Sequence, residues 1–312
     1  MALHPILFPI DQPIMPESRQ IGRRGEIGDL EARIITAGHQ WLIGPRRTGK
    51  TSVAKAVLAR LRQRHRVALD VDLSKVVVSE SRDLAGEIAR QAQAAHVGSN
   101  KMPKRLRDIA RGQSQKAKQL SGALKGIGFD SEADALAAAA SVLAEADDGG
   151  PGLQPVLEAL SLHARATGKS VTVLLDEVHL LADLPGAVEE VAIACREEDC
   201  PIVFLFAGSE EAAVRALREE GPLEQIGQEF TLGEIGFSDW LTGLGDRFEE
   251  AGVAIEQGDL YRILEASDGH PRRTMLICSY AHSAMRAQGT DTASSEVVGF
   301  AIRDAQGDRA WA

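Results

Sequence analysis

The chain has 312 residues, which is enough for about two domains, and its 45 acidic and 35 basic side chains give a net charge of −10. This charge argues against a protein that coats nucleic acid through a broad basic surface, and the few aromatic residues (8 Phe, 3 Trp and 2 Tyr) argue against a platform that stacks bases or sugars. Three cysteines without a Cys-x-x-Cys pair, no apolar run of about 18 residues and no signal peptide together predict a cytoplasmic protein with reduced thiols.

The first 20 residues are expected to form a separate arm. They contain Pro5, Pro9, Pro13 and Pro16, and each proline fixes φ and removes a backbone donor. The segment 1–20 is therefore predicted to be extended. It either straps across a neighbouring surface or remains a loose tail.

After this arm the pattern alternates between helix and strand. Apolar residues at helical spacing predict helices over 24–35, 51–64, 81–96 and 186–198. Alternating or continuous apolar runs predict strands over 39–43, 66–73, 171–175, 202–207 and 230–232. This alternation predicts an α/β fold with helices on both faces of a parallel sheet. From Ser238 onward the pattern is helical to the end, which predicts a small second domain.

One segment, about 99–150, differs in charge from the rest of the chain. Its basic part, Lys101–Lys125, is opposed only by Asp108 and contains Lys101, Lys104, Arg105, Arg107, Arg111, Lys116, Lys118 and Lys125. The stretch 130–148 then holds six acidic residues and no basic one. The pattern indicates a charged insertion. Its basic part either pairs with the acidic part or neutralises nucleic-acid phosphates.

Residues 44–51 read Gly-Pro-Arg-Arg-Thr-Gly-Lys-Thr and fit the phosphate-binding pattern G-x-x-x-x-G-K-[ST] between a strand and a helix. Gly44 and Gly49 let the backbone curl so that its N–H groups point at phosphate oxygens. Lys50 supplies a cation to the β- and γ-phosphates, and Thr51 supplies a hydroxyl to Mg²⁺. The helix that follows also directs its positive dipole end at the phosphates. The expected nucleotide-binding residues are Gly44, Pro45, Arg46, Arg47, Thr48, Gly49, Lys50, Thr51 and Ser52.

A second acidic element follows a buried strand, where residues 171–177 read Val-Thr-Val-Leu-Leu-Asp-Glu. Asp176 at the strand tip is expected to hold Mg²⁺. Glu177 is expected to act as the general base that polarises the attacking water. A small-molecule kinase needs no such glutamate, so the pair favours nucleotide hydrolysis.

The strand 202–207 ends in Gly208 and Ser209. Ser209 could sense the γ-phosphate from the tip of this strand. The alternative is a helix N-cap, because Glu210 and Glu211 follow.

These motifs together resemble the AAA+ ATPases of the STAND and origin-recognition group. The resemblance lies in GPRRTGKTS, VLLDEVH, the strand end AGS and the later Gly-His-Pro-Arg at 269–272. It implies a three-layer αβα P-loop core over 21–235 and a helical lid over 236–312. It also implies that Gly22 and Arg23, within IGRRGEI, lie near the adenine and that Pro271 approaches the base. Arg272 takes the place of a second-sensor arginine that reaches the γ-phosphate; the alternative is a solvated helix start.

The chain departs from this group in two places. The segment 222–226 has no arginine that could reach a neighbouring subunit's nucleotide, and Arg215 and Arg218 are weak substitutes. Only about 40 residues follow 269–272, which is too few for a lid and the winged helix of origin-binding relatives. The chain thus resembles a bare ATPase module.

The expected activity is ATP hydrolysis with Mg²⁺, and the absence of a guanine-reading Asn-Lys-x-Asp favours ATP. The leading hypothesis is a molecular switch whose lid movement couples nucleotide state to a partner protein or to self-assembly. One alternative is a DNA-associated ATPase of the transposition-helper or loader type that uses Lys101–Lys125. The other is a nucleotide-binding scaffold with negligible turnover. No membrane partner is expected.

Overall fold

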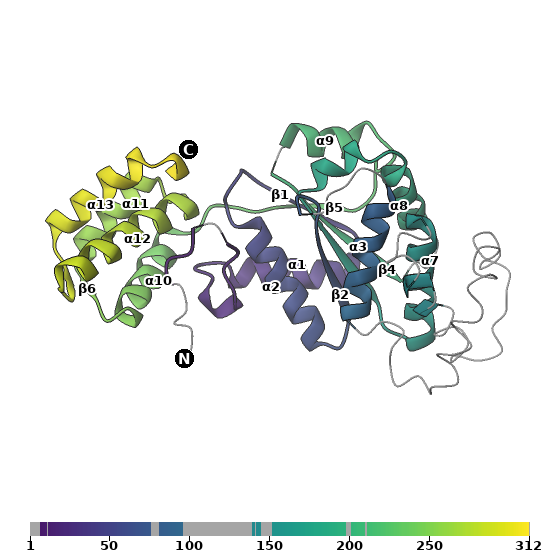
Figure 1. Ribbon diagram of the computed structural model, residues 1–312, viewed down its shortest axis with the longest axis horizontal. Coiled ribbons are helices and arrows are strands. Elements are labelled where there is room, and N and C mark those ends of the chain that lie inside the picture. Colours follow the sequence, from purple (N-terminus) through teal and green to yellow (C-terminus); the bar gives the residue numbers. More distant parts are fainter. Residues whose placement is uncertain are drawn as a thin grey trace. The chain divides into compact units, whose positions relative to one another are not determined.

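The computed structural model describes residues 7–10, 12–75, 81–95, 139–140, 142–144, 152–197, 201–209 and 211–311 (Figure 1). The chain divides into two compact units. One comprises Met1–Asp29, Gly44–Ala56 and Leu232–Ala312, and the other comprises Leu30–Ile43 and Val57–Thr231. The basic stretch Lys101–Lys125 lies outside the described residues, as does nearly all of the expected insertion.

The second unit contains a five-stranded parallel sheet in the order β2-β3-β4-β1-β5. The strands are β1 (Gln40–Ile43), β2 (Val67–Asp72), β3 (Val171–Asp176), β4 (Ile202–Ala207) and β5 (Gln228–Thr231). Every residue of β3 is buried, as expected for a central strand that is covered on both faces. The predicted parallel α/β P-loop fold is confirmed.

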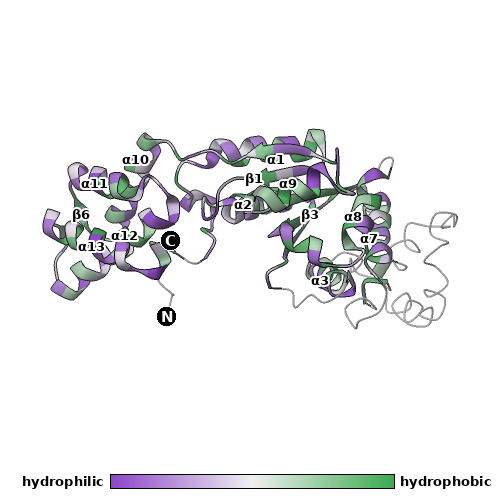
Figure 2. Ribbon diagram, turned by 90° about the horizontal axis from the view of Figure 1, so that it is seen from above, coloured by the Kyte–Doolittle hydropathy of each residue, from purple (hydrophilic) through white to green (hydrophobic). Residues whose placement is uncertain are grey.

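Helices alternate with these strands along the chain. They are α1 (Arg24–Ala37), α2 (Lys50–Gln63), α3 (Ser81–Ala94), α7 (Leu153–Thr167), the 3-10 helix η2 (Val178–Asp183), α8 (Ala187–Arg196) and α9 (Glu211–Glu219). Green, apolar residues alternate with purple, polar ones along the helices in Figure 2. Between the layers, Trp41 stacks on Phe206 with ring centroids 4.3 Å apart, and its indole N–H donates to the Ile226 carbonyl. This core holds the strand ends, and therefore the loops that follow them, in place.

The C-terminal part of the first unit is a helical subdomain, which we call the lid. It consists of α10 (Phe237–Glu250), α11 (Gln257–Ser267), α12 (Pro271–Gln288), α13 (Ser295–Gly307) and the 3-10 helix η3 (Arg309–Trp311). The expectation of helix alone misses a short parallel pair, β6 (Ala254–Ile255) and β7 (Thr292–Ala293). Two-residue strands are too short for an alternating pattern to reveal them. Among the described residues, no helix has the length and apolar character of a membrane span.

The described part of the N-terminal arm packs within the same unit. Phe8 is buried, and its ring lies 4.9 Å from that of Phe248. A 3-10 helix, η1 (Glu17–Arg19), interrupts the extended backbone. The buried Arg247 of α10 donates to the backbone carbonyls of Leu7 and Arg19. The arm is therefore tied to the lid by a charged side chain that has only neutral acceptors.

Candidate functional site

The loop that follows β1 has a strongly curled backbone. Gly44 and Gly49 have φ values of 155° and 99°, and Arg47 lies in the left-handed region with φ 64°. A non-glycine residue in that region carries strain, which tends to collect at ligand-binding loops. The loop ends where α2 begins, at Lys50, so the positive end of the helix dipole faces the loop.

Lys50 is 6% exposed and lies against this loop. Its Nζ donates to the carbonyl oxygens of Gly44, at 2.8 Å, and Pro45. The Thr48 hydroxyl also donates to the Pro45 carbonyl, at 2.9 Å. The ammonium group is thus positioned at the loop that the sequence assigns to phosphate.

Two residues from outside the loop anchor its backbone. Arg23 is buried and donates to the Thr48 carbonyl at 3.0 Å and the Gly233 carbonyl at 2.8 Å. His270 Nε2 lies 3.2 Å from the carbonyl oxygen of Arg46. Burial holds the pKa of His270 below its ordinary value, so the ring is neutral at pH 7 and Nε2–H can donate to this carbonyl. The lid residue just before α12 therefore contacts the loop directly.

A hollow of about 40 Å³ lies beside the loop, at the arm and the lid. Its wall is largely apolar and is formed by Ile14, Gln20, Ile21, Arg23, Thr48, Gly49, Ser52, Ile235, Trp240, Pro271 and Met275. Gln20 Nε2 donates to the carbonyls of Ile14 at 3.0 Å and Ser52 at 2.7 Å. These two acceptors determine which end of the amide is nitrogen. Gln20 Oε1 and Arg23 Nε are buried and have no hydrogen-bond partner among the described residues.

The carboxyl ends of β3 and β4 carry the acidic element. Asp176 is 3% exposed, and its Oδ1 accepts from the Glu177 N–H at 3.1 Å. Glu177 itself lies in the left-handed region, with φ 55°. Ser209 Oγ donates to Glu177 Oε2 at 3.2 Å, and His179 Nδ1 lies 3.4 Å from the same oxygen. Ser209 is therefore a partner of the expected general base.

Two further charged residues lie at this edge, and sequence reasoning missed them. Asp72 ends β2 directly opposite Asp176 of β3, and its carboxylate lies 2.6 Å from Lys75 Nζ. Burial alone would raise the pKa of Asp72, but hydrogen bonds from Lys75 and Ser74 lower it. Asp72 and, more weakly, Asp70 and Asp176 raise the pKa of Lys75. The sequence did contain a signal for Asp72, namely a carboxylate at the end of a predicted strand.

The two motifs leave the sheet at the same edge. All five strands are parallel, and β4 lies between β3 and β1. The phosphate loop starts directly after Ile43 of β1, at the edge where β3 ends in Asp176 and β4 leads to Ser209. Ligands of open α/β sheets bind at this carboxyl edge.

Arg272, the expected sensor, lies in the first turn of α12, and Pro271 occupies the first helical position. Arg272 Nε donates to the Ala310 carbonyl at 3.0 Å. Arg273 Nε donates to the Trp311 carbonyl at 3.1 Å, and its guanidinium lies 5.2 Å from the Trp311 ring centre. The structure therefore connects this arginine pair to η3.

The two weak substitutes for an intersubunit arginine, Arg215 and Arg218, are engaged with carboxylates. On α9, Arg218 pairs with Glu219 and Glu229, and Arg215 lies 4.0 Å from Glu219. Across the described ranges, no group of three or more His, Cys, Asp or Glu residues is arranged to hold a metal ion.

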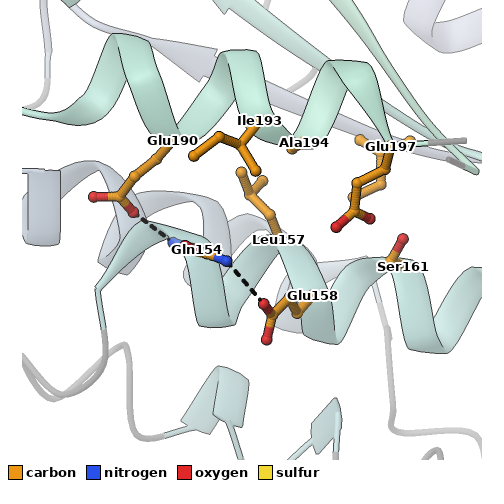
Figure 3. A pocket seen from close by; sticks show the side chains of 9 residues that line it. Gln154, Leu157, Glu158, Ser161, Glu190, Ile193, Ala194 and Glu197 are labelled. Atoms are coloured by element: carbon orange, nitrogen blue, oxygen red, sulfur yellow. Dashed lines mark hydrogen bonds between the residues drawn. The ribbon is translucent and has the colours of Figure 1, made fainter. Parts of the chain in front are cut away.

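A further hollow lies between α7 and α8 (Figure 3). Glu190 Oε2 accepts from the Gln154 backbone N–H at 2.6 Å, and the Gln154 amide donates to Glu158 at 3.1 Å. The hollow has a volume of about 10 Å³, which is room for about one water molecule. Its carboxylates serve the packing of the two helices, so this is not a candidate ligand site.

The fold and the phosphate loop agree with a comparison of the sequence with protein families. A model described as "AAA domain" matches residues 34–215, which is more than half of the chain. The chain belongs to the AAA domain family. It is an AAA-type P-loop ATPase.

Solved structures with the same fold include a Walker-type ATPase of Pyrococcus abyssi, with a TM-score of 0.66 and 18% identity over 97% of this chain and 75% of that chain. The ORC2 protein of Aeropyrum pernix in its ADP form has a TM-score of 0.62 and 20% identity over 96% of this chain and 72% of that one. The A. pernix ORC1 protein in complex with DNA has a TM-score of 0.55 and 16% identity over 95% of this chain and 69% of that one. No curated protein matches the sequence.

Proposed function

We propose that this ATPase is a molecular switch in which ATP binds at loop 44–51 and changes how the lid contacts that loop. The observation that carries the proposal is the contact of His270 with the Arg46 carbonyl, because it links the start of α12 to the phosphate loop. ATP that changes the conformation of the loop would move the Arg46 carbonyl and so alter this contact. The lid would then shift between a position with the contact and one without it, according to the difference in ATP affinity between the two.

The phosphates of ATP would bind the N–H groups of the loop and the N-terminal end of α2. Lys50 Nζ would exchange the carbonyls of Gly44 and Pro45 for β- and γ-phosphate oxygens. The ammonium group bonds to both kinds of acceptor, but a phosphate oxygen adds the attraction of a full negative charge, so the exchange favours the bound nucleotide. Arg46, Arg47 and Ser52 lie within or next to this loop in the sequence and would add polar groups to the site.

The hollow beside the loop is the proposed base site. Adenine donates from its exocyclic amine and accepts at its ring nitrogens, and so it can satisfy both Gln20 Oε1 and Arg23 Nε. A purine is larger than about 40 Å³, and so base binding requires the arm and the lid to move apart locally. Gly22 and Pro271, expected near the base, belong to the segments that would move.

Hydrolysis is assigned to Glu177, which would accept a proton from the attacking water. Glu177 follows the last residue of β3 and has a left-handed backbone conformation, so its side chain does not follow the alternation of the strand. The hydroxyl of Ser209 donates to one of its carboxylate oxygens. After γ-phosphate release, Ser209 and Arg272 would lose the group they sense, and the lid would return.

Mg²⁺ fits the residues present. Asp176 offers a carboxylate oxygen at the strand end, Thr51 offers a hydroxyl, and hard oxygen donors suit this ion. Bound Mg²⁺ would neutralise charge on the phosphates. A place within the STAND or origin-recognition group, with a protein partner, is part of the same proposal.

The test uses two variants of the full chain. Lys50→Ala should abolish ATP binding, measured by titration calorimetry. Glu177→Gln should bind ATP with an affinity within about threefold of wild type, because it removes no phosphate ligand. It should lower the turnover rate at least about 100-fold, since general bases contribute factors of 10² to 10⁴. A Glu177→Gln variant that hydrolyses ATP at the wild-type rate would contradict the proposed role of Glu177.

A scaffold with negligible turnover and a DNA-associated ATPase are the alternatives. Turnover that stays negligible at every protein concentration would favour the scaffold. The structural similarity to the ORC1 protein solved with DNA makes the second alternative worth testing.

A further inference from the structure

A basic hollow of about 520 Å³ lies in the sheet-containing unit, away from the carboxyl edge. It is formed where α2, α3 and α7 end and where β2 and β3 begin. The charged and titratable residues of its wall are Arg62, His65, Arg66, His163 and Lys169. None of the described residues that line it is acidic, although the chain as a whole has a net charge of −10.

The three permanent cations of this hollow are Arg62, Arg66 and Lys169. Among the described residues, no carboxylate lies within 4.0 Å of Arg62, Arg66 or Lys169. Arg62 Nε and Nη2 donate to the Ala68 carbonyl at 3.0 and 2.8 Å. Arg66 donates to the Ser170 hydroxyl. Both guanidinium groups are thus held by neutral acceptors, and their full positive charge remains.

Helix dipoles offer a simpler reason for basic residues here. The carboxyl ends of α2, α3 and α7 meet at the hollow, and each carries about half a negative charge. Three such ends sum to roughly −1.5, whereas the two arginines and one lysine supply three full positive charges. The dipoles therefore account for about half of the positive charge. The remainder attracts an anion.

The walls also indicate the kind of anion. Arg62, Arg66, Lys169 and Gln91 offer donors. The part of the wall that the structure describes has no Phe, Tyr or Trp on which a base could stack. A free nucleotide would find its base unrecognised, whereas the phosphates of a strand need donors only. We propose that this hollow binds the phosphodiester backbone of a nucleic-acid strand, without reading its sequence.

This site would lie at the opposite edge of the sheet from Asp176. It lies at the amino end of β2, near Val67, and Asp72 lies at the carboxyl end, five residues further along. At about 3.3 Å per residue, the two edges are roughly 17 Å apart. The proposal does not depend on ATP hydrolysis, so Lys50→Ala should retain nucleic-acid binding.

The test measures the affinity of the full chain for a fluorescent 20-base-pair DNA of mixed sequence between 20 and 200 mM salt. Each phosphate contact contributes about −0.9 to the slope of log affinity against log salt. The triple variant R62Q/R66Q/K169Q should bind at least about tenfold more weakly at low salt, and its slope should be shallower by about 2.7. The double variant R66Q/K169Q leaves the Arg62–Ala68 bond intact and should lose about 1.8 of slope.

The matched control is R165Q/R215Q/R286Q, which changes the net charge equally at exposed arginines outside the hollow. It should bind like wild type. Equal losses in the control and the triple variant would reduce the effect to net charge and overturn the proposal. So would wild-type protein that does not bind DNA at 20 mM salt, or a folded double variant with an unchanged slope. Tripolyphosphate that displaces the labelled DNA at a lower phosphate concentration than unlabelled DNA does would mean a small-anion site and would also overturn it.

Discussion

Ser209 Oγ donates a hydrogen bond to Glu177 Oε2 at 3.2 Å, so the polar residue after β4 holds the acidic residue after β3. The two strands are neighbours in the sheet. Glu177 is one-third exposed, and without this bond its carboxylate would sample several rotamers. The geometry couples the residue proposed to sense phosphate to the residue proposed to activate water.

Ser209→Ala should lower the turnover rate of ATP about tenfold, because losing one orienting hydrogen bond of about 1.4 kcal/mol corresponds to that factor. The KM for ATP should change less than about twofold, since Ser209 is not a phosphate-loop residue. Ser209→Thr keeps the hydroxyl and should restore most of the rate. Equal rates in wild type and Ser209→Ala would show that the bond does not serve hydrolysis.

The local motifs of this chain could be predicted because short segments determine them. The loop 44–51 needs glycine at 44 and 49 for its backbone, and the buried run before Asp176 can only be a covered strand. The fold followed from the alternation of such segments, and its strands match the structure within a few residues. The proposed roles of Asp176, Glu177 and Arg272 remain predictions.

Contacts between distant segments could not be predicted. Lys75 pairs with Asp72 only three residues earlier, but it comes near the charge of Asp176 because β2 pairs with β3, and the loop after β2 carries no motif. Gln20 reaches Ser52 across 32 residues, and nothing local to either residue signals it. The helix α7 was also missed, although its carboxyl end helps to form the basic hollow.

Gln20→Leu should weaken ATP binding about tenfold and leave GTP binding within about twofold of wild type. The Gln20 amide nitrogen is held by two carbonyls, so Oε1 is the atom left for the base. Adenine offers it a donor, whereas guanine places the oxygen O6 there. The measurement is the ratio of ATP to GTP affinity in calorimetric titrations. A loosened arm alone would weaken both nucleotides equally and leave this ratio unchanged, which would contradict the proposed base site.

Arg247→Met should lower the free energy of unfolding by about 2 kcal/mol. Two charge-assisted bonds to Leu7 and Arg19 are lost, each worth about 1.5–3 kcal/mol, and relief from burying the charge offsets part of this. Burial lowers the pKa of Arg247, which shows that the charged form is disfavoured by desolvation. Urea denaturation measures the change, and the exposed Arg286→Met is the control, with an expected effect under about 0.5 kcal/mol. A more stable Arg247→Met variant would mean that desolvation outweighs the bonds.

Stability should fall as the pH drops below 6.5. Burial is the largest cause of the lowered pKa values of His39, His163, His270 and His282. Below pH 6.5 these histidines are protonated in the unfolded chain but stay neutral in the folded chain until the pH reaches their lowered pKa values. The free energy of unfolding therefore decreases as the pH falls through this range. Above pH 6.5 the histidines are neutral in both states and the effect vanishes. His39→Asn should flatten the dependence, because His39 Nδ1 accepts from the Phe204 N–H at 3.0 Å and would lose this bond on protonation there. Urea midpoints at pH 7.5, 6.5 and 5.5 test this, and an unchanged midpoint across the range would contradict it.

The neighbours Arg272 and Arg273 make similar bonds to η3, so the pair can separate a sensor from a structural tie. Arg273→Ala loses the bond to the Trp311 carbonyl and the contact with its ring. It should cost about 1 kcal/mol of stability and leave ATP turnover unchanged. Arg272→Ala should lower the stability by a similar amount, because the bond to the Ala310 carbonyl is lost. It should also lower the turnover rate of ATP about tenfold, because the variant has no guanidinium that can move to the γ-phosphate. Steady-state kinetics and thermal unfolding of both variants decide between the two roles. If both lose stability and keep the wild-type rate, the arginines tie η3 to α12 and the sensor role of Arg272 is wrong.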